Sequence, residues 1–207
     1  MSTIKINEPI RLLAAQKDQA SEVLTKAFQN DIMYTYIFPD PNERVHSLRI
    51  IWDLIVSYSL VYGEVYTTSM VNGVACWLSP VNPDIRLQRM LHTGMGINRV
   101  AMQFEKESRL RFFDMISYVN ELHKRLIREP HWYLWALGVE PASQGQGTGG
   151  KLLKPVLTRA DEERIPCYLE TQKESNVAFY KKRGFEVLSE GEVPRHKIKA
   201  WAMLRTL

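Results

Sequence analysis

Cysteine is scarce in this 207-residue chain. Its two cysteines, Cys76 and Cys167, lie far apart and show no metal-binding spacing. Neither a disulfide framework nor a zinc site is therefore expected, and we predict no bound metal. So few cysteines are typical of a reducing compartment, and we predict a cytoplasmic location.

Long apolar runs are also missing. The first residues, MSTIKINEPIRLL, lack the apolar core of a secretory signal. The most apolar segment, residues 49–66, is interrupted by Asp53, Ser57 and Ser59, whereas a membrane-spanning helix needs roughly 20 consecutive apolar residues. We therefore expect no membrane association.

Charge of one sign is not concentrated anywhere. Lys and Arg number 27 against 23 Asp and Glu, which gives a formal net charge of +4. Because the basic residues are spread along the chain, no nucleic-acid partner is expected, but the balance suits an anionic small molecule. The chain has no repeats or linkers, and 45% apolar residues are enough for one core. We predict a single domain over residues 1–207, as a monomer or homodimer.

The hydrophobic pattern predicts a mixture of helices and strands. A hairpin is expected in residues 64–80, with Asn72-Gly73 as its two-residue turn. Residues 81–130 show helical periodicity, which predicts a helical insertion between two strands of one sheet. Further predicted segments are a strand in 4–13, helices near 16–28, 50–58, 149–160 and 175–185, and strands at 132–139, 165–171 and in the tail. Because hairpins flank a single β–α–β unit, the predicted fold class is α+β, or mixed α/β.

Glycine is clustered in one place, the sequence QGQGTGGKLL at residues 144–153. The stretch fits three loop patterns in which main-chain N–H groups approach phosphate at a helix N-terminus. The first is a P-loop, G-x-x-x-x-G-K. Leu152 stands where that loop needs a Ser or Thr hydroxyl for Mg²⁺, so the P-loop is rejected.

The second pattern is the dinucleotide fingerprint G-x-G-x-x-G, formed by Gly145, Gly147 and Gly150. Glu170 stands where a ribose-binding acid is expected. Residues 140–144, however, separate the preceding strand from the first glycine. The chain after Gly150 is also too short for the rest of a doubly wound sheet. This interpretation is a weaker alternative that stays open.

The third pattern covers more residues than the other two. The motif V-x-P-x-x-Q-x-x-G-x-G-x-x-L is formed by Val139, Pro141, Gln144, Gly147, Gly149 and Leu152. The motif N-x-x-F-Y-x-x-x-G-F follows, formed by Asn176, Phe179, Tyr180, Gly184 and Phe185. Two separated motifs in this order resemble the GNAT N-acetyltransferases. Within that family, the run from residue 132 onward and the upstream WLSP look most like puromycin N-acetyltransferase and its relatives.

The resemblance implies the acyl-CoA N-acyltransferase fold, a mostly antiparallel twisted sheet with flanking helices. It also implies acetyl-coenzyme A (acetyl-CoA) as the donor, with its pyrophosphate on the glycine loop. Its pantetheine arm would lie along the strand that ends at Val139. The implied cofactor-binding residues are Leu137, Gly138, Val139, Gln144, Gly145, Gln146, Gly147, Thr148, Gly149, Gly150, Asn176 and Tyr180.

Tyr180 matches the general-acid tyrosine of the family. A phenol with a pKa near 10 can protonate a coenzyme A thiolate as it leaves. The general base stays unassigned, because the strand at 132–139 carries no carboxylate. Glu170 and Tyr133 are candidates, and His131 or a chain of waters are further options.

The acceptor site is expected opposite the cofactor. The aromatic and acidic segment NDIMYTYIFPD offers Asp31, Tyr34 and Tyr36 for a cationic amine, and Trp77 on the hairpin is a further candidate. The predicted function is transfer of acetyl to the primary amine of a small molecule, such as an amino-nucleoside or another xenobiotic, in a ternary complex. The alternatives are a protein or peptide N-acetyltransferase and a non-catalytic acyl-CoA sensor.

Overall fold

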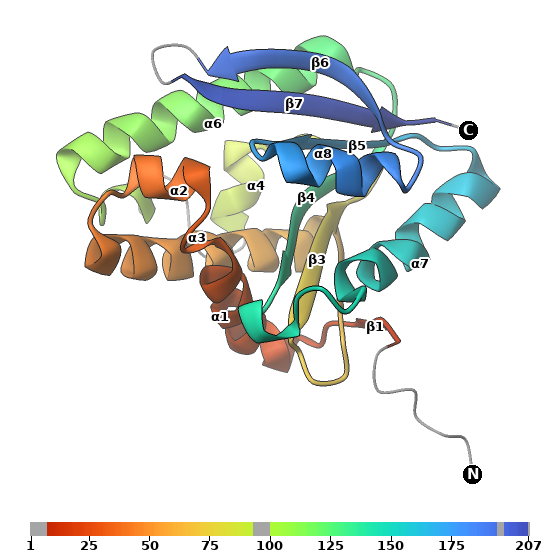
Figure 1. Ribbon diagram of the computed structural model, residues 1–207, viewed down its shortest axis with the longest axis horizontal. Helices are drawn as coiled ribbons and strands as arrows, with labels where there is room; N and C mark the ends of the chain where they lie inside the picture. Colours follow the sequence, from red (N-terminus) through yellow and green to blue (C-terminus); the bar gives the residue numbers. More distant parts are fainter. Residues whose placement is uncertain (1–7, 93–99, 194–196, 207) are drawn as a thin grey trace.

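The computed structural model describes residues 8–92, 100–193 and 197–206. These residues form a seven-stranded sheet in the order β1-β2-β3-β4-β5-β7-β6 (Figure 1). The strands are β1 (Ile10–Arg11), β2 (Gly63–Thr67), β3 (Gly73–Leu78), β4 (Trp132–Val139), β5 (Cys167–Thr171), β6 (Glu186–Val193) and β7 (Ile198–Arg205). Neighbouring strands are antiparallel except β4 and β5. The predicted mixed α/β class with a mostly antiparallel sheet is confirmed.

Helices precede, interrupt and follow the strands. They are α1 (Lys17–Phe28), α2 (Ile32–Ile37), α3 (Pro41–Tyr62), α4 (Leu87–His92), α6 (Lys106–Leu126), α7 (Thr148–Glu163) and α8 (Glu174–Lys181), with short 3₁₀ helices at Ala14–Gln16 and Pro141–Ser143. Two carboxylates cap the N-termini of α2 and α3. Asp31 accepts from the N–H of Met33 at 3.0 Å and begins α2, and Asp40 caps α3 ahead of Pro41. Within the described ranges, no helix is long and apolar enough to cross a membrane.

Strands β4 and β5 run together for only three residues, Trp132–Leu134 on β4 and Cys167–Leu169 on β5. Beyond this point β4 pairs with β3 alone as far as Val139. A register shift against β3 leaves Trp135 as an extra residue, a β-bulge that bends and twists its strand. The two strands therefore part in the middle of the sheet.

Each face of the sheet has its own core. On one face, side chains of α1, α3 and α6 pack against Tyr133 and Tyr168. On the other, side chains of α7 and α8 pack against Cys167 and Leu169. Because side chains alternate along a strand, Glu170 of β5 belongs to the same face as Tyr168.

The hairpin of β2 and β3 is present, but its predicted turn is wrong. Residues 68–72 form the connection, Gly73 is already in β3, and Val71 is the residue there with a positive φ, of 50°. Thr68 Oγ1 donates to Asn72 Oδ1 and accepts from the N–H of Asn72. These side-chain bonds close a longer loop in place of the two-residue turn. The first strand is shorter than predicted, and residues 4–7 of that prediction lie outside the described residues.

Candidate active site

Two cavities adjoin where β4 and β5 part. Two residues of β4 that stand two positions apart line different cavities, Trp135 the first and Leu137 the second. The same holds after β5, where Gln172 lines the first cavity and Lys173 the second. The two cavities therefore lie on opposite sides of the gap between the two strands and meet there.

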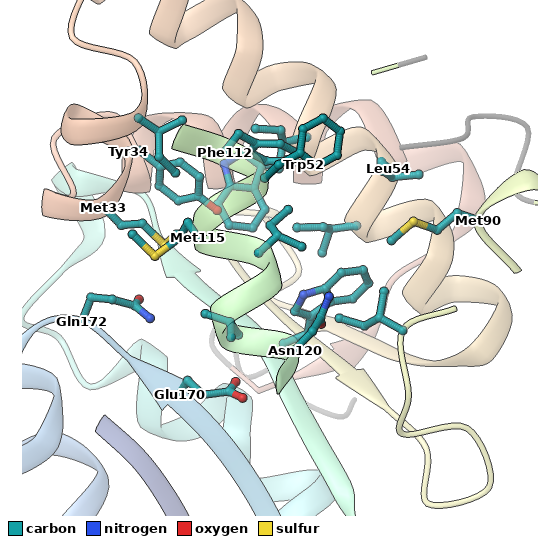
Figure 2. Close-up of a pocket in the computed structure, with 18 of the residues that line it drawn as sticks. Met33, Tyr34, Trp52, Leu54, Met90, Phe112, Met115, Asn120, Glu170 and Gln172 are labelled. Atoms are coloured by element: carbon teal, nitrogen blue, oxygen red, sulfur yellow. The ribbon is translucent and has the colours of Figure 1, made fainter. Parts of the chain in front are cut away.

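The first cavity, called the apolar cavity, has a volume of about 340 Å³ and lies between the sheet and helices α2, α3 and α6 (Figure 2). Its lining residues are Met33, Tyr34, Ile37, Ile51, Trp52, Leu54, Ile55, Ile85, Met90, Phe112, Phe113, Met115, Ile116, Val119, Asn120, Tyr133, Trp135, Glu170 and Gln172. Among these described residues, Glu170 is the only Asp, Glu, Lys, Arg or His. Figure 2 shows Glu170, Gln172 and Asn120 at one end and Trp52 and Leu54 across the cavity from them.

Glu170 occupies the point at which β5 leaves β4. Its neighbour on β7 is Ala202, and β4 no longer pairs at this level. Glu170 is half-buried, and its side chain lines the apolar cavity. Its Oε1 atom is buried and has no hydrogen-bond partner in the described part of the chain. Burial raises the pKa of Glu170 to about 7, although the nearby hydroxyls of Tyr133 and Tyr168 favour the charged form.

The other two candidate bases lie in different surroundings. Tyr133 also lines the apolar cavity, and burial together with Glu170 raises its pKa well above the usual value, so the phenol stays protonated. His131 lines neither cavity. Its Nε2 lies 2.7 Å from Nε2 of His123, and its Nδ1 lies 2.7 Å from the carbonyl oxygen of Glu129. Both ring nitrogens of His131 are therefore engaged in the fold.

The second cavity, called the basic cavity, has a volume of about 580 Å³ and lies between the end of β4, the start of α7 and helix α8. Its lining residues are Ala27, Phe28, Asp31, Leu137, Gly138, Val139, Ser143, Gln144, Gly145, Gly147, Thr148, Gly149, Lys173, Ser175, Asn176, Ala178, Phe179, Tyr180, Lys182 and Arg183. Three of these described residues are cationic, Lys173, Lys182 and Arg183, and one, Asp31, is acidic. The balance favours a ligand with several negative charges.

The glycine loop brings a free helix end to this cavity. Gly145 and Gly147 have φ of 76° and 77°, in the left-handed region that other residues adopt at a cost. Gly147 is the N-cap of α7 and supplies no side chain to cap it. The first N–H groups of α7 thus lack intrahelical partners and carry the positive end of the helix dipole. Gln144 holds the loop, because its Nε2 donates to the carbonyl oxygen of Val139 at 2.9 Å.

Helix α8 supplies the opposite wall of the basic cavity. Tyr180 is 8% exposed there, and its hydroxyl makes no hydrogen bond to the described residues. Burial raises the pKa of Tyr180, so it remains a proton donor at neutral pH. Asn176 donates from Nδ2 to Thr171 Oγ1 at 3.1 Å and so ties α8 to β5. Arg183 stacks its guanidinium 3.5 Å from the centre of the Phe179 ring.

The structure brings most of the predicted cofactor residues together. All of them line the basic cavity except Gln146 and Gly150. Gly150 packs directly against the side chain of Arg183. A Cβ atom added at Gly150 would stand 2.3 Å from the guanidinium, which leaves no room for a larger residue while Arg183 keeps this position. The residues that sequence reasoning missed are the cations Lys173, Lys182 and Arg183. Lys182 and Arg183 belong to the basic run KKR just before Gly184, at the end of the helix that carries Tyr180, and this run was their signal; Lys173 lies outside it.

The predicted acceptor residues are dispersed. Tyr34 lines the apolar cavity, whereas Asp31 lines the basic cavity and caps α2. Tyr36 lines neither and lies under the guanidinium of Arg111, 5.8 Å from its ring centre. Trp77 is fully buried in the core under α7, on the other face of the sheet from the apolar cavity. Among its acceptor candidates, sequence reasoning named none of the residues of α3 and α6 that line the apolar cavity.

Comparisons with known proteins agree with this geometry. Residues 112–185 match the model of the Acetyltransferase (GNAT) family. An uncharacterized N-acetyltransferase of Schizosaccharomyces pombe is 27% identical over 181 residues, which cover 84% of this chain and 72% of that protein.

Solved structures show the same fold. The Corynebacterium glutamicum structure described as histone acetyltransferase HPA2 and related acetyltransferase has a TM-score of 0.67 at 22% identity, covering 96% of this chain and 95% of that one. Arylalkylamine N-acetyltransferase 2 from Aedes aegypti has a TM-score of 0.60 at 15% identity, covering 96% and 98%.

The parted sheet, the glycine loop and these matches define an acyltransferase fold of the GNAT type. The chain resembles the acetyltransferases of the GNAT family over residues 112–185 and in its fold. The narrower likeness to puromycin N-acetyltransferase gains no support from these matches and stays a prediction.

Proposed function

We propose that the protein transfers the acetyl group of acetyl-CoA to the primary amine of a small molecule, by direct attack within a ternary complex. One observation carries the proposal. The apolar and basic cavities adjoin at the gap between β4 and β5, with Glu170 in the first and Tyr180 in the second. An amine and a thioester held in these cavities would meet at that gap.

The basic cavity suits the donor chemically. The N–H groups at the start of α7 would hold the pyrophosphate, helped by a helix dipole worth about 0.3–1 kcal/mol per charge. Residues 136–138 of β4 pair with β3 on one edge and with no described strand on the other, and the amides of the pantetheine arm would pair with that second edge like an added strand. Asn176 and Arg183 are further proposed contacts, the latter to phosphate.

Acid and base roles follow from the two environments. At neutral pH a primary amine is mostly protonated, and Glu170 would remove one proton before or during attack. The amine nitrogen then bonds to the thioester carbonyl carbon and the carbon–sulfur bond breaks. Tyr180 would donate its proton to the departing thiolate, and the second proton that the nitrogen loses as the amide forms would return the Tyr180 phenolate to the phenol. Glu170 is preferred to Tyr133 as the base because the raised pKa of Tyr133 keeps that phenol protonated.

The test is acetyl-CoA turnover over a panel of amines that includes puromycin, with the Tyr180→Phe variant alongside. We expect amine-dependent release of coenzyme A that falls in Tyr180→Phe. Tight coenzyme A binding without turnover of any amine would instead indicate an acyl-CoA sensor. Turnover confined to protein or peptide substrates would indicate a protein acetyltransferase. Binding of a nicotinamide cofactor in place of coenzyme A would support the dinucleotide alternative.

A further inference from the structure

The apolar cavity also limits which amine can be accepted, an inference that rests on the proposed function. We propose that the acceptor carries one amino group on a compact apolar body of aromatic size, and is neither a polyamine nor the lysine side chain of a protein.

The distribution of polar groups in the cavity supports a single positive charge. Glu170, Gln172 and Asn120 gather at one end, where an ammonium would find its partners (Figure 2). The opposite end presents Trp52 and Leu54, and no second acidic side chain is found among the described lining residues. A second ammonium would therefore be buried there without a counter-charge, which is costly.

The size and enclosure of the cavity favour a compact body. Its volume of about 340 Å³ is near the lower end of the range for ligand pockets. Helix α6 lines one side through Met115 and Ile116, and α3 lines another through Trp52 and Leu54. A peptide needs an open groove for the residues on either side of its lysine, whereas the described lining comes from the sheet and from helices on several sides of the cavity.

The lining chemistry favours a ring with variable substituents. Tyr34 and Trp52 already pack edge to face, with ring centroids 5.6 Å apart, and a further aromatic ring would extend this arrangement. Met33, Met90 and Met115 also line the cavity. Methionine side chains adapt to irregular shapes, so we expect tolerance toward ring substituents.

Two matched pairs of amines separate the effect of a second positive charge from the effect of an aromatic ring. n-Hexylamine and 1,6-diaminohexane differ in the second charge, and 2-phenylethylamine and ethylamine differ in the ring. We expect kcat/KM for the diamine to be about 100-fold below that of n-hexylamine, and that of 2-phenylethylamine to exceed that of ethylamine by about 100-fold. A lysine-containing peptide should be the poorest acceptor. Calorimetric binding of each amine to coenzyme A-loaded protein should give the same order without turnover.

A variant with one added carboxylate tests whether the missing counter-charge explains the lower kcat/KM expected for the diamine. Ile116 is half-buried on α6, one turn before Asn120, and lines the cavity. Ile116→Glu would supply a second carboxylate, and we expect the ratio of diamine to monoamine kcat/KM to rise about tenfold or more. Ile116→Gln, the matched neutral control, should leave that ratio unchanged. If Ile116→Glu does not fold, the matched pairs of amines assayed on the unaltered protein still test the proposed acceptor class.

The outcomes separate this inference from the proposed function. Tyr180-dependent turnover that favours the diamine or the peptide would overturn the acceptor class and leave acetyl transfer standing. Preferential binding of n-hexylamine and 2-phenylethylamine without any turnover would support the acceptor class and overturn acetyl transfer. Equal binding and equal turnover of both members of each pair would overturn the acceptor class.

Discussion

Replacing Glu170 by Gln tests whether Glu170 is the base. It also tests how much the burial of its carboxylate lowers the free energy of unfolding. Burial raises its pKa from 4.5 to about 7, which corresponds to about 3 kcal/mol in favour of the protonated form. Because the folded-state pKa lies above the unfolded value, the contribution of Glu170 to stability is fully present below about pH 4.5. It falls as the pH rises and is lost above about pH 7.

The variant should therefore be less active and more stable at once. A glutamine side chain cannot ionise, so at pH 8 we expect the free energy of unfolding of Glu170→Gln to exceed that of the unaltered protein by up to about 3 kcal/mol. The corresponding rise in melting temperature is up to roughly 10 °C. Near pH 4.5 the two proteins should be equally stable. Loss of the base should lower kcat/KM by about 10²–10⁴-fold and remove its rise with pH near 7.

Urea unfolding at pH 4.5, 6 and 8 measures the stability difference, and steady-state kinetics from pH 6 to 9 measures the activity. Glu192→Gln, an exposed residue of β6, is the control for loss of one negative charge. The reasoning is refuted for catalysis if Glu170→Gln keeps the full rate and pH profile. It is refuted for stability if the variant is less stable than the unaltered protein at pH 8.

Three further outcomes are expected. Tyr180→Phe should lower kcat by about 10²-fold or more with little change in KM for acetyl-CoA, because it removes a proton donated only as the thiolate leaves; an unchanged kcat would argue against the acid role. Gly147→Ala, at a φ of 77°, should be strained by about 1–2 kcal/mol and weaken acetyl-CoA binding in calorimetry, whereas Ala142→Ser in the exposed turn before the loop should not. Arg183→Met should weaken coenzyme A binding by about tenfold and reduce its salt dependence, and the exposed α7 residue Lys154, changed to Met, should have no such effect.

The fold and the glycine loop that lines the basic cavity could be predicted from sequence because their requirements are local. Left-handed backbone at Gly145 and Gly147 demands glycine, so the loop shows in the residues themselves. The strand at 132–139 is rich in aromatic and branched residues and needs no distant partner to be recognised. The Asn72-Gly73 turn failed because Thr68 binds Asn72 through side chains and lengthens the loop.

The apolar cavity could not be predicted, because it is assembled from distant segments. Met33, Met115 and Gln172 meet across one cavity, and each comes from a segment whose apolar pattern is the same as that of an ordinary core. The sequence makes Glu170 a candidate base but does not show its surroundings. Its raised pKa arises from burial at the parting of two strands, which no spacing along the chain reveals.

The two cavities have no described lining residue in common. The family match begins at residue 112, so helix α3 and residues 33 and 34, which line only the apolar cavity, lie outside it. A substitution in these segments therefore changes the lining of the apolar cavity and leaves the described lining of the basic cavity intact. Two chains that share the match over residues 112–185 can thus differ in the side chains that α2 and α3 bring to the apolar cavity.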